Sequence, residues 1–164
     1  MHNEKEWFTE SVLNCQTGLY NLAFGILKNE EDAKDAIQDT LYKAYDKLDS
    51  LKNTKKFKPW IMKILTNSAY EILRKRKDTV CIDEQFSIAA PEETDVNIKL
   101  TLWDAVQLLE LQNRTVIVLF YYEDLSIKEI SRITDLKPDA VKKRLSRARG
   151  QLKYLLEEKE VVKE

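Results

Sequence analysis

The chain has 164 residues, of which 34% are charged and 43% hydrophobic, with 3 glycines and 3 prolines. This length suits one ordinary domain or two small ones, and so few helix breakers predict an all-α protein rather than a β-sandwich, a collagen or a low-complexity tail. The single histidine, His2, and the widely separated Cys15 and Cys81 argue against a metal site, a disulfide scaffold and an enzyme with a cofactor.

The sequence has no apolar run of 18 residues, and its beginning, MHNEKEWF, is largely polar. Neither a membrane-spanning helix nor a secretion signal is therefore expected. We expect a cytoplasmic protein that does not insert directly into a membrane.

Three helices are predicted in the first half of the chain. Apolar residues recur every three or four positions over residues 5–28, which is the period of a half-buried helix. Asn29 is placed to cap a second helix that runs to about residue 48, with acidic residues in its first turn. Residues 49–56 are predicted to form a loop, and Pro59 suits the first turn of a third helix over residues 58–77.

The helical period fails over residues 78–95, which include six acidic residues and no basic ones. This stretch predicts a flexible acidic linker between two small helical domains, residues 1–77 and 96–164. In the second domain we expect helices at 96–110, 112–122, 126–133 and 138–158.

The last two of these helices are separated by four residues and predict a helix-turn-helix. Ser126 and Glu129 form the pattern of a capping box, and Asp135 lies where the turn calls for a left-handed residue. A solvated helix face usually mixes both charge signs, but the second helix is almost purely basic, which favours DNA contact. Its outward face would present Asp139, Ala140, Lys142, Lys143, Ser146 and Arg147.

The net charge of −1 conceals two basic segments in an acidic frame. Residues 52–77 hold nine basic residues and one acid, and residues 137–153 hold seven basic residues and one acid. Two such segments indicate two separate contacts with a polyanion. In the first segment aromatic residues lie among the basic ones, as in grooves for single-stranded nucleic acid. Trp60 and Tyr70 fit the core better than base stacking, and Phe57 remains open between the two.

Three stretches of this sequence resemble the extracytoplasmic-function (ECF) group of bacterial RNA polymerase sigma factors. They are residues 19–48, with the segment DAKDAIQD at 32–39; residues 57–77, FKPWIMKILTNSAYEILRKRK; and residues 103–152, with FYYEDLSIKEIS and AVKKRLSRAR. The resemblance covers both predicted domains in the family's order.

The resemblance implies that the chain directs core RNA polymerase to promoters. The helix over residues 30–47 would bind the clamp helices of the polymerase through Asp32, Asp35, Gln38 and Asp39. The unpaired strand of the −10 element would be captured by Ser50, Lys52, Asn53, Lys55, Lys56, Phe57 and Lys58. Further along the helix over residues 58–77, Asn67, Arg74 and Arg76 would contact the DNA backbone or the nearby duplex. The duplex −35 element would be contacted by Arg114, Ser126, Lys128, Lys137, Asp139, Ala140, Lys142, Lys143, Arg144, Ser146 and Arg147.

The resemblance also implies regulation by an anti-sigma protein, often anchored in the membrane, that covers or separates the two domains. We expect a monomer with no cofactor, no metal and no enzymatic reaction of its own. The alternatives are an autonomous helix-turn-helix regulator that binds a palindrome without polymerase, and an adaptor that mimics one partner. An enzyme is disfavoured because neither a catalytic triad nor a glycine-rich phosphate loop is present.

Overall fold

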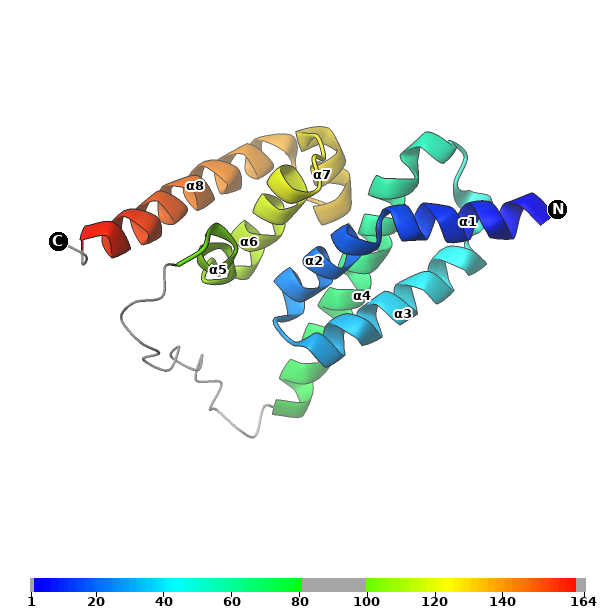
Figure 1. Cartoon of the computed structure of the whole chain (residues 1–164), viewed down its shortest axis with the longest axis horizontal. Helices are drawn as coiled ribbons and strands as arrows, with labels where there is room; N and C mark the ends of the chain where they lie inside the picture. The colour runs from blue at the N-terminus through cyan, green and yellow to red at the C-terminus, as the bar shows by residue number, and fades with distance from the viewer. Residues whose placement is uncertain (1, 81–99, 162–164) are drawn as a thin grey trace.

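The computed structural model describes residues 2–80 and 100–161, and every regular element in those ranges is helical. The first half contains four α-helices and two short 3₁₀ turns; the second contains four α-helices and one π-helical turn (Figure 1). The elements in chain order are α1 (His2–Asn14), α2 (Gln16–Leu27), α3 (Glu30–Asp46), η1 (Leu48–Ser50), η2 (Thr54–Lys56), α4 (Phe57–Val80), α5 (Leu102–Gln107), α6 (Leu111–Ile117), η3 (Val118–Tyr122), α7 (Ile127–Thr134) and α8 (Pro138–Val161).

Local capping chemistry explains where several helices begin. The Asn29 side chain accepts a hydrogen bond of 3.0 Å from the Asp32 amide, which confirms the predicted cap of α3. Ser126 and Glu129 form the predicted reciprocal capping box of α7. Asp135 ends α7 with φ of 59°, the left-handed conformation expected of it.

Several helix boundaries differ from the sequence prediction. The helix expected over 5–28 is two helices that meet at Cys15, whose amide bonds to Val12 three residues back and closes α1. The helix expected over 112–122 changes to a π turn after Ile117. The helix expected over 96–110 appears as α5, which starts at a Thr101–Asp104 capping box. The linker is expected to begin at residue 78, but residues 78–80 continue α4 to Val80; residues 81–95 lie outside the described residues.

In the first half α2, α3 and α4 pack against one another, and α1 extends from this bundle (Figure 1). The inner face of α3 consists of the small residues Ala33, Ala36, Thr40 and Ala44, all fully buried. Small side chains allow the neighbouring backbones to approach closely. The outer face of α3 is left for charged residues.

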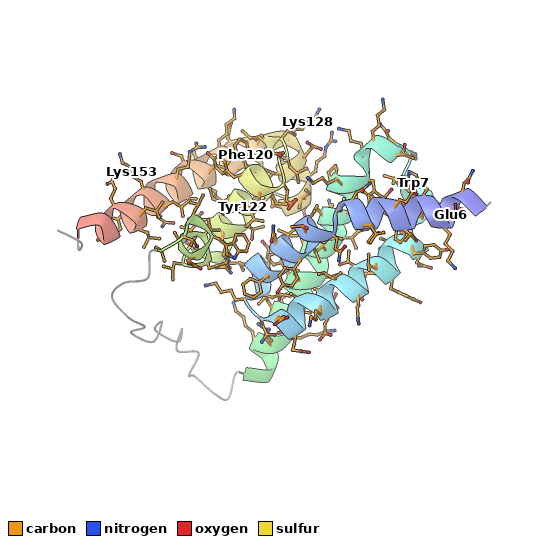
Figure 2. The ribbon with its side chains drawn as sticks, in the orientation of Figure 1. Glu6, Trp7, Phe120, Tyr122, Lys128 and Lys153 are labelled. Carbon is orange, nitrogen blue, oxygen red and sulfur yellow. The ribbon has the colours of Figure 1, made fainter. Side chains whose placement is uncertain are left out.

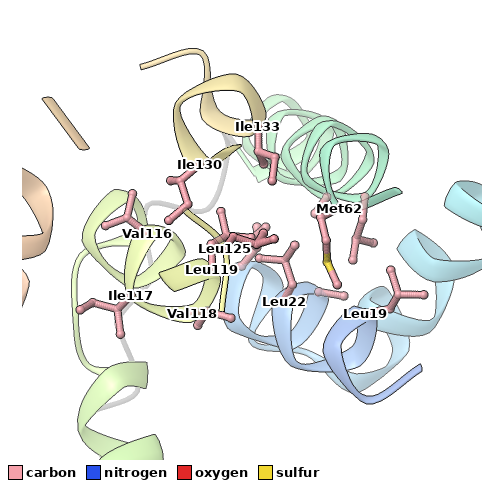
Figure 3. Close-up of a cluster of buried hydrophobic side chains, with 14 of the residues drawn as sticks. Leu19, Leu22, Met62, Val116, Ile117, Val118, Leu119, Leu125, Ile130 and Ile133 are labelled. Atoms are coloured by element: carbon pink, nitrogen blue, oxygen red, sulfur yellow. The ribbon is translucent and has the colours of Figure 1, made fainter. Parts of the chain in front are cut away.

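The two halves of the chain pack against each other and share a continuous hydrophobic core. Helix α4 contacts α7, and α2 contacts α6 and the π turn. Figure 3 shows Leu22 and Met62 of the first half in the same cluster as Leu119 and Ile133 of the second. The two predicted domains therefore meet along a seam, which we define as the contact of α2 and α4 with α6, η3 and α7.

Candidate nucleic-acid and polymerase interfaces

The outer face of α3 is acidic, as the sequence predicts. Asp35 and Gln38 are exposed, and Asp39 is partly exposed on the next turn. Lys43 approaches Asp39 at 2.8 Å and Glu71 of α4 at 3.5 Å, which fixes α3 on α4. The hydrogen bond from Lys43 holds the pKa of the Asp39 carboxyl below its usual value.

Asp32 is less available than the rest of this face. Its carboxylate is paired with Arg76 of α4, and Arg76 also donates a hydrogen bond of 3.3 Å to the Leu27 carbonyl. One predicted polymerase contact and one predicted −10 contact are thus bound to each other. The pair ties the start of α3 to the C-terminal part of α4.

Sequence reasoning missed one residue on the acidic face of α3, Tyr42. Its side chain is 76% exposed, and it follows Asp35, Gln38 and Asp39 by seven, four and three positions. Residues with these spacings lie on one side of a helix. An exposed aromatic ring on the same helix face as two carboxylates and an amide has the composition of a binding hot spot with a polar rim. Helical periodicity from Asp35 was the signal that could have identified it.

The segment expected to hold the −10 strand is partly exposed and partly built into the core. Lys52 is exposed between the two 3₁₀ turns, and Lys55 and Lys56 are exposed on the second of them. The side chains of Ser50 and Asn53 shape these turns: Ser50 donates to the Lys47 carbonyl at 2.6 Å, and Asn53 accepts from the Lys55 amide at 3.0 Å.

The sequence left open whether Phe57 packs in the core or stacks on a base, and the structure places it in the core. It is 5% exposed and packs edge-to-face on Trp7 and Phe8, with Trp60 beside it. In this arrangement its ring belongs to an aromatic cluster rather than to an exposed stacking platform. Further along α4, Asn67 and Arg74 are exposed.

The helix-turn-helix presents its predicted DNA-facing side to solvent. Lys142, Lys143 and Arg147 on α8 are exposed and form no ion pair with the part of the chain that the structure describes. The same face carries exposed Asp139 and Ser146, with Ala140 and Arg144 half-buried beside them. Ser126, Lys128 and Lys137 are exposed near the turn, and Figure 2 places Lys128 on the outer side of the α7–α8 pair.

Arg114, a predicted phosphate contact, lies in the seam and is 6% exposed. Its guanidinium donates to the Gly25 carbonyl, to the Ile26 carbonyl at 3.3 Å and to the Leu109 carbonyl at 2.7 Å. Burial lowers the pKa of this guanidinium. In this arrangement Arg114 joins the second half of the chain to α2 and does not reach the surface.

A second polar contact crosses the seam at Glu123, which follows the π turn and is 5% exposed. Its carboxylate lies 3.6 Å from Lys58 and lies so close to Gly18 that a Cβ there would overlap it. Burial raises the pKa of the Glu123 carboxyl, and the Lys58 ammonium opposes that rise. Sequence reasoning did not identify Glu123, although a glycine inside a helical repeat is a signal of close approach.

An open cleft of about 1210 Å³ lies along the seam, with α2 and α4 on one side and α6 and α7 on the other. Its apolar lining includes Leu27, Leu73 and Leu136, and basic residues stand around it. No cluster of three or more metal-binding side chains occurs among the described residues. Within the same ranges, no helix is both long and apolar enough to cross a membrane.

Comparison with known proteins identifies the family of both halves of the chain. Residues 12–79 match the family model of sigma-70 region 2, and residues 99–152 match that of sigma-70 region 4. The chain is 33% identical to the RNA polymerase sigma factor SigV of Bacillus subtilis, over 84% of this chain and 83% of SigV. It is 30% identical to the ECF RNA polymerase sigma factor SigW of the same organism, over 93% of this chain and 90% of SigW.

Solved structures extend the likeness to three dimensions. The sigma factor RpoE of Bartonella quintana, in complex with the anti-sigma factor NepR, superposes with a TM-score of 0.77 at 27% identity and covers 92% of this chain and 96% of RpoE. CnrH, solved with the cytosolic domain of CnrY, shares the fold with a TM-score of 0.67 at 23% identity, over 95% of this chain and 91% of CnrH. The chain belongs to the ECF group of RNA polymerase sigma factors, which are transcription initiation factors, with region 2 in its first half and region 4 in its second.

Proposed function

We propose that this sigma factor binds core RNA polymerase through α3 and contacts the promoter through the two basic segments, without catalysing a reaction itself. The observation that carries the proposal is the separation of charge: an acidic face on α3 and an exposed basic face on α8. Opposite charges on separate faces favour two different partners, because an acidic face repels DNA and attracts a basic protein surface. Because its partners act there, the proposal places the protein in the bacterial cytoplasm.

The proposed polymerase contacts are Asp35, Gln38 and Asp39, with Tyr42 as an aromatic anchor in their midst. Asp32 would join them only if its pair with Arg76 rearranges. Electrostatic complementarity of this kind mainly sets the orientation and the rate of association, whereas a desolvated aromatic ring contributes to affinity.

For the −35 element, we propose that α8 enters the major groove of the duplex and recognises its base sequence. Lys142, Lys143, Ser146 and Arg147 are placed to reach base edges, and Ser126, Lys128, Lys137 and Arg144 to reach phosphates. Ala140, at the start of α8, is small enough to allow close approach of the helix to the groove, and the Asp139 carboxylate beside it could accept a hydrogen bond from the amino group of a cytosine.

For the −10 element, the proposed contacts are the exposed Lys52, Lys55 and Lys56, followed by Lys58, Asn67, Arg74 and Arg76 on α4. Capture of an unpaired base costs a few kcal/mol of unstacking, which contacts to the backbone and a pocket must offset.

We further propose that an anti-sigma protein with a cytosolic domain regulates this chain. Two observations support this: the matched RpoE and CnrH structures each contain such a partner or its cytosolic domain, and the cleft along the seam here has an apolar lining with Lys28, Arg74 and Lys77 around it. An apolar segment flanked by acidic residues would complement this cleft.

Run-off transcription with bacterial core polymerase tests the proposal, on a template that carries the promoter upstream of the protein's own gene. We expect a transcript that requires the protein and is lost with Lys143→Glu or with Asp35→Lys. The matched controls are Lys5→Glu and Glu10→Lys, both at exposed positions of α1, which make the same charge changes on another surface. Tight binding of the duplex without polymerase, combined with no transcript, would instead indicate an autonomous regulator.

A further inference from the structure

One ion pair inside region 2 joins a residue of the acidic face of α3 to a residue of the −10 segment. Asp32 lies in the first turn of α3, and Arg76 lies toward the C-terminal end of α4. The Arg76 guanidinium pairs with the Asp32 carboxylate and donates a hydrogen bond of 3.3 Å to the Leu27 carbonyl at the end of α2. Both side chains of the pair are 26% exposed, so charged groups of a partner can reach them from solvent.

The residues beside this pair on the two helices are not paired in the same way. Asp35, three positions after Asp32, and Arg74, two positions before Arg76, are both exposed. Neither forms an ion pair with residues 2–80 or 100–161. The Asp32–Arg76 pair therefore withdraws one negative charge from the face proposed to bind polymerase and one positive charge from the segment proposed to bind DNA.

Each member of the pair keeps a favourable partner when the other one leaves. Asp32 remains in the first turn of α3, where the partial charge of the helix is positive, and its amide remains bonded to Asn29. Arg76 remains beside the Leu27 carbonyl, at the negative end of α2. An ion pair that solvent can reach is also weak. Exchange of either partner for a charged group of a ligand therefore leaves no isolated buried charge.

We propose that the Asp32–Arg76 pair couples the binding of core polymerase to the capture of the −10 strand. A basic group of the polymerase takes the Asp32 carboxylate, and Arg76, left without that partner, binds a phosphate of the unpaired strand. The coupling is reciprocal, because a phosphate that draws Arg76 away leaves Asp32 free for the polymerase. This inference deepens the proposed roles of α3 and the −10 segment and rests on them.

Removing Asp32 from the pair should strengthen binding of a single strand by the free chain. For full-length Asp32→Asn, fluorescence anisotropy with a short single-stranded oligothymidylate should give about fivefold tighter binding, at the lower end of couplings between sites. The slope of log affinity against log salt should steepen by about 0.7, the value for one added phosphate contact on a single strand. Glu31→Gln, an exposed neighbour in the same turn, makes the same charge change and should keep the wild-type slope. A wild-type slope in Asp32→Asn would overturn the coupling.

Removing Arg76 should have the corresponding effect on the polymerase. We expect Arg76→Gln to bind core polymerase about fivefold more tightly in the absence of DNA, because Asp32 then has no internal partner to give up. Lys77→Gln, at the exposed next residue, removes the same charge and should bind as the wild type does. Weaker binding in Arg76→Gln would overturn the coupling, because the pair would then orient Asp32 for the polymerase. A folding defect would weaken binding, so it cannot produce either expected gain.

The double variant distinguishes failure of the coupling from failure of the proposed −10 contact. In the Asp32→Asn background, Arg76→Gln should abolish the gain in oligothymidylate binding and return the salt slope to the wild-type value, whereas in the wild-type background it should have little effect. Equal weakening by Arg76→Gln in both backgrounds would keep Arg76 as a DNA contact and overturn the coupling. Weakening in neither background would overturn both the coupling and the proposed contact of Arg76 with the −10 strand.

Discussion

The two basic segments of this sigma factor are alike in sequence but stand in different surroundings. In residues 52–77 several cations already have acidic partners: Lys58 with Glu123, Lys63 with Asp135, and Arg76 with Asp32. On α8 the proposed base-reading cations are exposed and have no ion pair among the described residues. The comparison teaches that local charge identifies a polyanion-binding segment, whereas the fold decides whether that segment is available.

The largest effect should come from reversing a charge on each segment. Lys143→Glu is expected to weaken binding of promoter duplex by about 10- to 100-fold, both in the free chain and in the holoenzyme, because a base contact is worth about 1–3 kcal/mol. Lys58→Glu should weaken promoter binding in the holoenzyme but have little effect in the free chain, where Lys58 is already paired. Fluorescence anisotropy with a forked promoter fragment measures both, with Lys5→Glu on α1 as the control.

The proposed difference between the two segments would be contradicted if Lys58→Glu weakened promoter binding by the free chain as strongly as Lys143→Glu does. The salt dependence provides a second check, because each lost phosphate contact lowers the slope of log affinity against log salt by about one unit. In the free chain the slope should therefore fall for Lys137→Glu, at a proposed phosphate contact of the helix-turn-helix, and not for Lys58→Glu.

A somewhat smaller effect is expected at the polymerase-binding face. Tyr42→Ala should weaken binding to core polymerase by about tenfold, because a central exposed aromatic ring is a typical hot spot worth more than about 1 kcal/mol. Tyr42→Phe keeps the ring and should remain near the wild type. Affinity would be measured by competition for core polymerase, and Tyr154→Ala on α8, also at an exposed tyrosine, is the control. Equal affinities of Tyr42→Ala and Tyr154→Ala would remove Tyr42 from the interface.

Asp135→Gly is expected to produce a modest gain in stability. Asp135 has φ of 59°, which glycine adopts without steric cost, so the free energy of unfolding should rise by up to about 1 kcal/mol. The lost pair with Lys63 is largely exposed and contributes little. Urea denaturation measures the change, with Asp135→Asn expected to lie between the two. A loss of stability in Asp135→Gly would show that the Lys63 pair outweighs the backbone strain.

The smallest expected effect is on the pH dependence of stability. The contributions of the Glu123 and Asp39 carboxyls to this dependence should have opposite signs. The folded-state pKa of Glu123 is raised, so its contribution to stability is greatest at low pH and is lost as pH rises through that pKa. Lys58 of α4, Asp124 and the Cys15 thiol are the ionisable groups around it. Glu123→Gln should therefore flatten the decline of stability with rising pH, as followed by urea denaturation.

At Asp39 the folded-state pKa is lowered by Lys43, so its contribution is present above the ordinary carboxyl pKa and is lost as pH falls. Asp39→Asn should therefore flatten the loss of stability on acidification. The same direction of change in Asp39→Asn and Glu123→Gln would contradict these assignments.

Local features of this fold were predictable from the sequence, and distant ones were not. The cap at Asn29, the capping box at Ser126 and the left-handed turn at Asp135 depend on neighbours within a few residues, and all three predictions are confirmed. Arg114 binds carbonyls 88 and 89 positions away, and no side-chain pattern marks a backbone acceptor. Its position before the apolar run TVIVLF was the available sign that it faces inward.

The exposed face of α8 was also predictable, because helical periodicity separates the packed side from the solvent side. The pairing of Lys58 and Lys63 was not, because it depends on how two halves of the chain meet. Tyr42 shows an intermediate case: its helix and face follow from periodicity, but its exposure depends on how α3 packs with small residues against α2 and α4.

The most direct test of this account measures the distance between the halves in the free protein and in the holoenzyme. Spin labels at Glu10→Cys on α1 and Glu157→Cys on α8, in a background with Cys15→Ser and Cys81→Ser, would report it by double electron–electron resonance; both labelled positions are exposed. The account predicts one narrow distance in the free protein and a different, longer distance with core polymerase and promoter DNA. The same distance in both states would contradict the expectation, drawn from the pairs of Lys58 and Lys63 with region 4, that the seam opens when the −10 segment binds DNA.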